Sequence, residues 1–473
     1  MQNTETLLAA FFELIKPYLA KSNLPENKVV EYLSPAKLRQ QIDLPVHQSG
    51  ESFEQILDYI RQYLQYTVNT GNRQFFNQLY AGFNLPAFTG EVVTALTSTS
   101  MYTYEVAPVA TLIEAEMIDK MCHIAGYENG DGIFVTGGSN SNLMAMFSAR
   151  NRSLPEIKNT GLYGIPHLSA FVSQEAHYSF ETAANLLGIG SASVYKIKTS
   201  KEGKMLPGDL ARQMQQSAEK GEEPFFVAAT AGTTLLGAFD PIPEIVETAH
   251  RHHAWVHVDG SFGGSLILSP RMRSLFEGLE HTDSFTWNPH KLMNIPLVCS
   301  AILVREKGRL QKNLTNLHDD YIYHDTDTGN CDLGKKSVQC GRRVDALKLW
   351  LAWKYYGDDG YASRIDNLLE MAHYFESKVK VDERFELMAP RQSLTVCFRY
   401  LPQNTDDADD FNSNLREALR TSGKSLVNFG HLNGHFAFRW VVANAEVTKS
   451  DVDVFFENLT QTAGHLDAAE HII

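Results

Sequence analysis

Between residues 76 and 345, the sequence alternates short apolar runs with segments long enough to form helices. The clearest apolar runs are residues 170–172, 225–229, 255–258 and 301–304. Runs of this length are typical of strands buried on both faces, and the segments between them are long enough for crossover helices. The pattern predicts an α/β fold with a mostly parallel sheet covered by helices. In such folds ligands bind at the carboxyl ends of the strands.

Two charged residues lie close to predicted strand ends. Asp259 directly follows the run 255–258, and Lys291 comes shortly after a second short run at 284–287. Each residue alone would be interpreted as a helix cap or a surface lysine. Together they can reach opposite sides of one small ring. Pyridoxal phosphate (PLP) requires this pair, a lysine for a Schiff base and a carboxylate that keeps its pyridine nitrogen protonated. The pair therefore predicts a PLP site.

Three further motifs follow predicted strands. Residues 137–142 read Gly-Gly-Ser-Asn-Ser-Asn, a glycine turn at a helix start that can bind an anion. His177 follows the run 170–172 and could lie flat on a planar ring. Residues 231–234, Ala-Gly-Thr-Thr, offer small side chains and hydroxyls at a strand end. Each motif also has an ordinary interpretation, as a capped turn, a surface-loop histidine or turn chemistry.

Charge and cysteine content exclude several classes of protein. The formal net charge of −14 argues against nucleic acid or anionic membranes as partners, because both bind basic patches. An acidic substrate would therefore need a dedicated arginine. The five cysteines are odd in number and lack metal-ligand spacing, so we expect free thiols in a reducing compartment and no metal.

The N-terminal apolar residues predict a short amphipathic helix. They recur at helical spacing between positions 7 and 19, charged residues interrupt them, and Pro17 should end or kink the helix. No basic segment precedes them, so a signal peptide or membrane span is not expected. We therefore predict a cytoplasmic protein.

Three segments are expected along the chain. Residues 1–75 are predicted to be mostly helical, and such a segment packs either on a partner subunit or on its own chain. Residues 76–345 form the large domain, and residues 346–473 form a smaller α/β domain with strands at 395–400 and 436–442. The helical spacing in the first segment is carried by Phe53, Ile56, Leu57, Ile60, Leu64 and Val68.

Six longer motifs carry a resemblance to a known family. They are FFNQL at 75–79, YTYEVAP at 102–108, ATAGTT at 229–234, GAFDP at 237–241, NPHK at 288–291 and QCGRR at 339–343. With these motifs in this order, the chain resembles the group II PLP-dependent decarboxylases of fold type I over about residues 50–465. Within them it is similar to the glutamate and cysteine-sulfinate branch. The resemblance implies a seven-stranded sheet, the cofactor PLP, α-decarboxylation to an amine and CO₂, and a homodimer with shared active sites.

The resemblance also implies roles for individual residues. Lys291 would carry PLP covalently, Asp259 would pair with the pyridine nitrogen, and His177 would stack on the ring. Many relatives have Asp-Ala-Ala where this chain has Asp-Gly-Ser, so Ser261 would lie beneath the ring as an added hydrogen-bond donor or simply a small residue. The other expected cofactor contacts are Ser139, Asn140 and His290 at the phosphate, with Gly138, Thr233 and Asn288.

Substrate choice is expected to depend on three positions. Arg439 matches an arginine that binds the substrate's side-chain acid in the acidic branch, and Gln78 matches a glutamine that assists it. An arginine in a structural ion pair is the alternative. Tyr80 occupies a position that is small in glutamate-specific relatives, so it would shorten the pocket. The sequence therefore favours a shorter acid, cysteine sulfinate or aspartate, over glutamate.

The segment between His318 and Gly334 is the best candidate for a mobile loop. Its matching position in the glutamate branch is a tyrosine that returns a proton to the substrate, and this position falls on Cys331. Tyr321 and Tyr323 lie earlier in the segment and could take over that role. If no residue does so, slow protonation would favour transamination or oxidative release of an aldehyde.

Other functions remain in competition. The chain could decarboxylate a different amino acid such as 2,4-diaminobutyrate, or act as a PLP-dependent aldehyde synthase or transaminase. A paralogue that binds PLP without catalysis is a further alternative, although the intact Lys291, Asp259 and His177 argue against it. A nicotinamide-binding protein and a metal hydrolase are excluded for lack of the required motifs.

Overall fold

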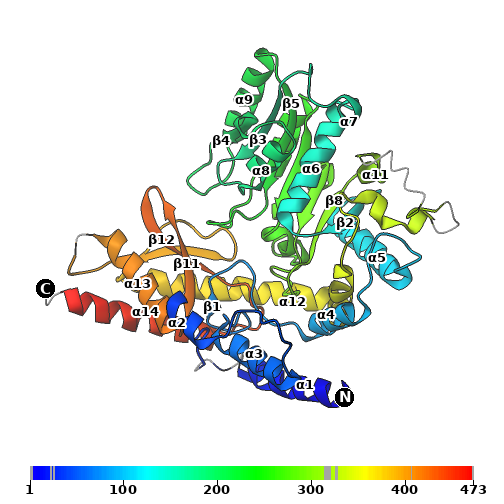
Figure 1. Cartoon of the computed structure of the whole chain (residues 1–473). Helices are drawn as coiled ribbons and strands as arrows, with labels where there is room; N and C mark the ends of the chain where they lie inside the picture. Colours follow the sequence, from blue (N-terminus) through cyan, green and yellow to red (C-terminus); the bar gives the residue numbers. More distant parts are fainter. Residues whose placement is uncertain are drawn as a thin grey trace. The chain divides into compact units, whose positions relative to one another are not determined.

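The computed structural model describes residues 4–21, 24, 27–313, 321–324, 329–405 and 407–470. The chain divides into two compact units (Figure 1). One unit comprises Phe83–Leu369 and Arg391–Ser393. The other combines the described residues of Met1–Gly82, Glu370–Pro390 and Leu394–Ile473. The structure therefore joins into one unit the N-terminal and C-terminal segments that the sequence analysis treated separately.

The larger unit is built around the predicted sheet. Its strand order is β2-β8-β7-β6-β5-β3-β4. Only β8 runs antiparallel to its neighbours β2 and β7, and the other neighbouring pairs are parallel. The prediction of a mostly parallel seven-stranded sheet is confirmed. The strands are β2 (Asp131–Val135), β3 (Leu168–Ser173), β4 (Val194–Ile197), β5 (Glu223–Thr230), β6 (Trp255–Gly260), β7 (Ser284–Trp287) and β8 (Ser300–Val304).

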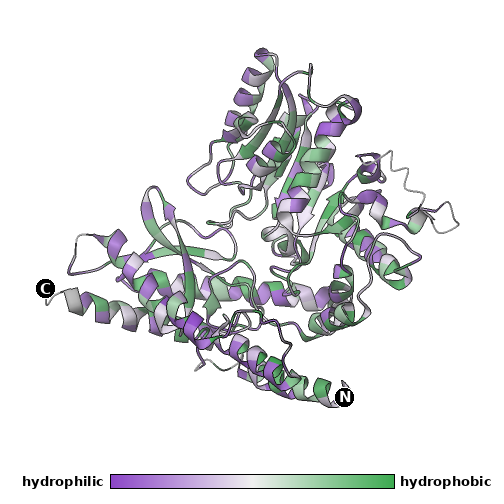
Figure 2. Cartoon of the chain, in the orientation of Figure 1, coloured by the Kyte–Doolittle hydropathy of each residue, from purple (hydrophilic) through white to green (hydrophobic). Residues whose placement is uncertain are grey.

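Helices cover this sheet on both faces. Every residue of β2, β3, β6, β7 and β8 is buried, which requires cover on each side. Figure 2 shows these apolar strands in green beside helices with purple outer faces. The helices are α4 (Leu85–Thr97), α5 (Pro108–Ala125), α6 (Gly138–Ser153), α7 (Ile157–Thr160), α8 (Ser179–Leu186), α9 (Pro207–Glu219), α10 (Ile242–His250) and α11 (Arg309–Asn313).

Short 3₁₀ turns connect several of these elements. Two of them, η2 (Gly263–Leu268) and η5 (Gly329–Cys331), belong to segments that the sequence analysis linked to function. The others are η1 (Ser191–Ser193), η3 (Arg273–Phe276), η4 (Leu279–His281) and η6 (Leu333–Lys336).

The second unit contains a five-stranded sheet in the order β1-β11-β12-β10-β9. Its strands are β1 (Phe75–Phe76), β9 (Phe385–Leu387), β10 (Thr395–Tyr400), β11 (Leu426–Leu432) and β12 (His435–Val441). The strands predicted at 395–400 and 436–442 are therefore present. Its helices are α1 (Thr4–Lys21), α2 (Pro35–Gln41), α3 (Phe53–Tyr66), α13 (Ala408–Ser422) and α14 (Lys449–Glu470).

Helix α1 confirms the predicted N-terminal helix but not its end. The helix continues through Pro17 to Lys21, whereas the sequence predicted a break or kink at the proline. The proline leaves the carbonyl of Glu13 without its helical hydrogen bond, and the helix still adds one more turn beyond it. In the part of the chain that the structure describes, no helix is long and apolar enough to cross a membrane.

Helix α12 (Asp345–Val381) belongs to both units. The sequence placed a boundary at residue 345, where this helix begins, but the units change between Leu369 and Glu370. Gly357 has a non-helical φ of 67° and kinks the helix. Because the helix continues across the change of unit, the hydrophobic pattern of the sequence gives no sign of the boundary there.

Candidate active site

A small cavity lies at the carboxyl ends of the parallel strands, where the sequence predicted the ligand site. Its volume is about 180 Å³, and it belongs entirely to the larger unit. Side chains reach it from the turn after β2 and from residues at or just beyond the ends of β3, β5, β6 and β7. The predicted residues that line it are Gly138, Ser139, His177, Asp259, Ser261, Asn288, His290 and Lys291.

Asp259 is the penultimate residue of β6, and its side chain is held as a carboxylate. It is only 4% exposed. Its Oδ1 accepts a hydrogen bond from the Ser261 backbone at 2.9 Å, and its Oδ2 accepts one from Asn142 Nδ2 at 2.9 Å. Burial alone would raise the pKa of Asp259, but the hydrogen bonds from Ser261 and Asn142 outweigh it and hold that pKa below its usual value. The cavity therefore contains a buried anion.

Lys291 reaches the cavity from a tight turn after β7. The turn is closed by a hydrogen bond from the Lys291 backbone N–H to the carbonyl of Asn288 at 3.0 Å. The side chain is half-buried in the cavity wall. β6 and β7 are parallel neighbours, with Asp259 opposite Thr286. This pairing brings the aspartate and the lysine to one cavity although 31 residues separate them in the sequence.

His177 lies between β3 and α8, and its ring is electrically neutral. Its Nδ1 accepts a hydrogen bond from the Ser179 backbone at 3.2 Å, so the neutral ring carries its hydrogen on Nε2. Burial lowers the pKa of His177; the Asp259 carboxylate opposes this shift, and the Lys291 ammonium adds to it. A neutral, half-buried imidazole of this kind is suited to stack on an aromatic ligand.

His290 is also neutral and fixed in orientation. Its Nδ1 lies 2.6 Å from the carbonyl oxygen of Cys299 and 3.2 Å from the backbone nitrogen of the same residue, so Cys299 holds the ring from one side. Burial, with the neighbouring Lys291 charge, lowers the pKa of His290 to about 4. The ring is therefore uncharged at neutral pH.

The start of α6 forms the remaining wall. Gly137 precedes the helix with a φ of 124°, a conformation that favours glycine, and no side chain caps the first turn. Gly138 touches its neighbours so closely that a Cβ there would collide with Ser261 Oγ and lie 2.9 Å from Asn288 Nδ2. Backbone amides at such a helix start can bind a phosphate.

Four of the predicted catalytic and cofactor-binding residues do not line the cavity. The Thr233 hydroxyl accepts a hydrogen bond from the Ala238 backbone at 3.0 Å, so it closes a turn. Asn140 lies in the first turn of α6 outside the cavity wall. Cys331 lies in η5, and Tyr323 packs against Gly334 and Lys335.

The predicted mobile segment is described only in part. Of the stretch from His318 to Gly334, residues 318–320 and 325–328 lie outside the described residues. The positions of Tyr321, Tyr323 and Cys331 are described, but none of the three contributes to the cavity wall. Their predicted part in protonation therefore stays a prediction.

Six lining residues were not predicted as site residues. Gly232 and Thr234 flank Thr233 in the motif at 231–234. Asn142 falls inside the glycine-turn motif, four residues beyond the turn. These two motifs are the signals that could have identified three of the residues. The full set is Asn142, Glu175, Thr230, Gly232, Thr234 and Phe262.

The cavity wall fits PLP. Lys291 offers a primary amine, Asp259 a carboxylate, His177 a neutral ring, and the start of α6 an anion site. The Thr230 hydroxyl oxygen is buried and has no hydrogen-bond partner in the described part of the chain, so it is available to a polar group of a ligand. A side chain at position 138 would collide with Ser261 and Asn288 in the cavity wall, and glycine avoids that collision.

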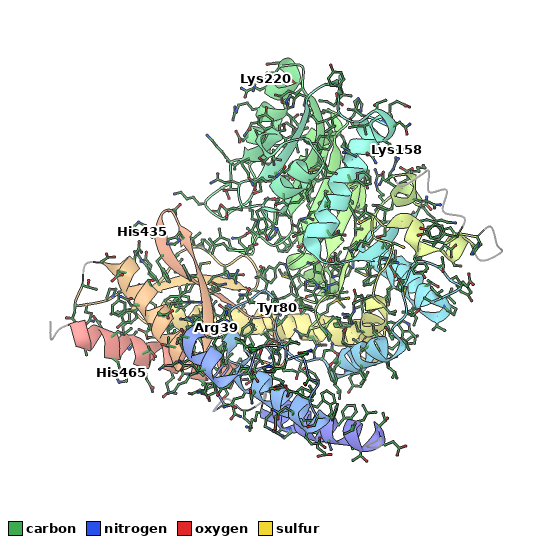
Figure 3. All side chains as sticks on the ribbon, viewed as in Figure 1. Arg39, Tyr80, Lys158, Lys220, His435 and His465 are labelled. Atoms are coloured by element: carbon green, nitrogen blue, oxygen red, sulfur yellow. The ribbon has the colours of Figure 1, made fainter. Side chains whose placement is uncertain are left out.

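The three predicted substrate-binding residues belong to the other unit. Arg439 on β12 is 5% exposed, and its guanidinium donates a hydrogen bond to the carbonyl of Asn77 at 2.6 Å. The structure thus brings Arg439 beside the segment that contains Gln78 and Tyr80, although about 360 residues separate them in the sequence. Gln78 and Tyr80 are half-buried, and Tyr80 is labelled in Figure 3.

Comparison with known proteins agrees with this site. The family described as "Pyridoxal-dependent decarboxylase conserved domain" matches residues 35–401. The human protein named cysteine sulfinic acid decarboxylase is 39% identical over 470 residues, covering 96% of this chain and 95% of that protein. The mouse protein named acidic amino acid decarboxylase GADL1 is 37% identical over 459 residues, covering 94% and 84%. The crystal structure of mouse CSAD has a TM-score of 0.93 and 38% identity, covering 97% of this chain and 98% of that one.

Proposed function

Because this chain belongs to the pyridoxal-dependent decarboxylase family, we propose that it uses PLP to remove the α-carboxyl group of a small acidic amino acid. The observation that carries the substrate class is the buried Arg439 beside the segment with Gln78 and Tyr80. With a net charge of −14, the protein as a whole repels an acidic substrate, so a local guanidinium is needed to bind one. The names of the human and mouse relatives support the same class of substrate.

The cavity residues have distinct roles in this proposal. The primary amine of Lys291 would hold the cofactor covalently. Asp259 keeps a proton on the ring nitrogen, and His177 packs on the ring face. When bound, PLP withdraws electrons from the substrate's α-carbon as CO₂ leaves. The start of α6 and His290 hold the phosphate.

The substrate class is tested by offering the PLP-loaded protein a mixture of amino acids. We expect amine and CO₂ from cysteine sulfinate, aspartate or glutamate, measured by mass spectrometry. We expect Arg439→Gln to lower kcat/KM for the acid by about 10²-fold, because a charged hydrogen-bonding partner of the carboxylate or sulfinate is lost. Arg399→Gln, on the neighbouring strand β10, is the control and should retain full activity.

Two results would count against this proposal. If amine forms from 2,4-diaminobutyrate but from none of the acids, Arg439 does not bind an acidic side chain of the substrate. Aldehyde or keto acid in place of amine would favour the aldehyde synthase or transaminase alternative, in which case Cys331 at the tyrosine position of the loop becomes the first residue to change.

Tyr80 is proposed to set the length of acid accepted. Its ring lies 6.5 Å from that of Phe75, centroid to centroid, which limits the space for its movement. We expect Tyr80→Ser to raise kcat/KM for glutamate relative to cysteine sulfinate by about tenfold, a discrimination typical of about one methylene in a pocket. An unchanged ratio of the two kcat/KM values in competition assays would rule Tyr80 out as the determinant of chain length.

We further propose that the chain forms a homodimer through its N-terminal helices. None of α1, α2 and α3 contains a fully buried residue. The apolar Leu8, Phe12 and Ile56 are 53%, 42% and 41% exposed. An amphipathic helix with an exposed apolar stripe is typical of an interface.

The dimer is tested by sedimentation equilibrium, which should give the mass of two 53.0 kDa chains. We expect the double variant Leu8→Glu/Ile56→Glu to raise the dimer dissociation constant by at least tenfold, because two charges would be buried unpaired. Tyr163→Glu, at a side chain that is 97% exposed in the other unit, is the control. A monomeric wild-type protein, or a double variant as dimeric as the wild type, would refute the proposed interface.

A further inference from the structure

Behind Asp259 lies a chain of buried polar side chains that the proposed chemistry does not use. Asn142 on α6 is 1% exposed, and His257 on β6 is fully buried. Asn142 Nδ2 donates to Asp259 Oδ2 at 2.9 Å, and His257 Nε2 lies 3.0 Å from Asn142 Oδ1. The three residues therefore form a continuous hydrogen-bonded line that leads from the interior of the sheet to the cavity.

The hydrogen bonds of Asn142 fix the orientation of its amide. Its Nδ2 also donates to Ser179 Oγ at 2.9 Å, and its Oδ1 also accepts from Thr286 Oγ1 at 2.9 Å. With two donated and two accepted bonds the amide is saturated. A reversed amide would place its oxygen against the Asp259 carboxylate, acceptor against acceptor. The amide therefore always presents an N–H to Asp259.

The tautomer of His257 is set in the same way. Trp255 Nε1 can only donate, and it donates to Ser284 Oγ at 2.7 Å. Ser284 Oγ also lies 2.8 Å from His257 Nδ1, while Asn142 Oδ1, which can only accept, lies 3.0 Å from His257 Nε2. His257 consequently carries its own hydrogen on Nε2, where it meets Asn142 Oδ1.

The surroundings of His257 keep the ring neutral. The rings of Phe180 and Phe226 each lie 6.0 Å from the imidazole, centroid to centroid. Burial lowers the pKa of His257 to about 4, and the Asp259 carboxylate only partly opposes this shift. At neutral pH the line from His257 to Asp259 therefore holds a single negative charge, at the end that borders the cavity.

We propose that Asn142, oriented by His257 and Thr286, is a positioning residue that keeps Asp259 ionised and thereby keeps the ring nitrogen of PLP protonated. This inference rests on the role proposed for Asp259. Asp259 Oδ2 accepts a hydrogen bond from Asn142, Oδ1 accepts one from the Ser261 backbone, and the Ser261 side chain is a third donor to the carboxylate. Since a carboxylate can accept about four hydrogen bonds, an acceptor site remains for the ring nitrogen.

The test uses the full-length protein reconstituted with PLP carrying ¹⁵N in its ring, because the ¹⁵N chemical shift reports whether that nitrogen is protonated. In the wild type we expect the protonated value. Asn142→Leu, which is close in volume, removes the N–H to Asp259. It is expected to move the shift towards the unprotonated value and to raise the PLP dissociation constant about tenfold.

His257→Phe keeps the aromatic packing but removes the donor to Asn142, so a smaller change in the same direction is expected. If Asn142→Leu fails to fold, the ¹⁵N shift of His257→Phe tests the positioning role of Asn142 in its place. Tyr127→Phe is the matched control, because it removes another buried hydrogen bond of the same unit, at 2.6 Å to Thr282, away from the cavity. It should lower the melting temperature without changing the ¹⁵N shift.

The outcomes separate this inference from the proposed function. If Asp259→Asn removes the ring proton but Asn142→Leu and His257→Phe both retain the wild-type shift, the positioning role is overturned and the role of Asp259 stands. If Asp259→Asn also retains the proton, the role of Asp259 itself fails, and with it the inference.

Discussion

Replacing Lys291 with alanine is expected to abolish decarboxylation and covalent attachment of PLP together. The loss in kcat/KM should be at least about 10³-fold, equivalent to about 4 kcal/mol of transition-state stabilisation, since the amine that exchanges with the substrate is gone. Borohydride reduction followed by mass spectrometry of the peptides should attach PLP to Lys291 in the wild type and leave the corresponding variant peptide unmodified.

The control for this prediction is Lys201→Ala, at an exposed lysine of the same unit. It should decarboxylate at the wild-type rate and retain the reduced label at Lys291. A Lys291→Ala protein that keeps more than about a tenth of wild-type kcat/KM would show that another amine carries the cofactor. Labelling of a different lysine in the wild type would lead to the same conclusion.

The strands of the larger unit were predictable because buried strands appear in the sequence as short, mostly apolar runs. β7, at Ser284–Trp287, was predicted at its exact bounds, and β6 and β8 were predicted within two residues of theirs. These strands are buried on both faces and are too short for helices, so their length separates them from the helical segments. The division into two units was not predictable in this way, because α12 continues across the boundary at Glu370.

The cavity residues that could be predicted are those whose side chains have a distinctive chemical role. Asp259, Lys291 and His177 follow strands, and their side chains line one cavity as expected. A turn hydroxyl and a ligand hydroxyl look alike in the sequence, and the structure shows that Thr233 accepts a bond from the Ala238 backbone while its neighbours Gly232 and Thr234 line the cavity. Asn142 lies a full turn into α6, where helical phase alone decides that it faces Asp259.

Asp259 combines two properties that rarely coexist, deep burial and a retained charge. A carboxylate taken out of water is normally stabilised by a cation or becomes protonated. Here Asn142 and the Ser261 backbone supply neutral donors instead, at 2.9 Å each. The nearest imidazole in this line, His257, is neutral. The charge is therefore left for a cationic partner on the cavity side, which is the place expected for the protonated ring nitrogen.

The substitution Asp259→Asn tests that arrangement with little change in shape. An amide cannot hold a proton on the ring nitrogen by charge, and its NH₂ group would face the Asn142 NH₂ group, donor against donor. We expect kcat/KM to fall by about 10³-fold and the PLP dissociation constant to rise, measured by steady-state decarboxylation and by absorbance titration of the apo-protein. Asp358→Asn, at a carboxylate that is 63% exposed, should leave both quantities unchanged. An Asp259→Asn protein with activity within tenfold of the wild type would mean that the cofactor works here without a protonated ring nitrogen.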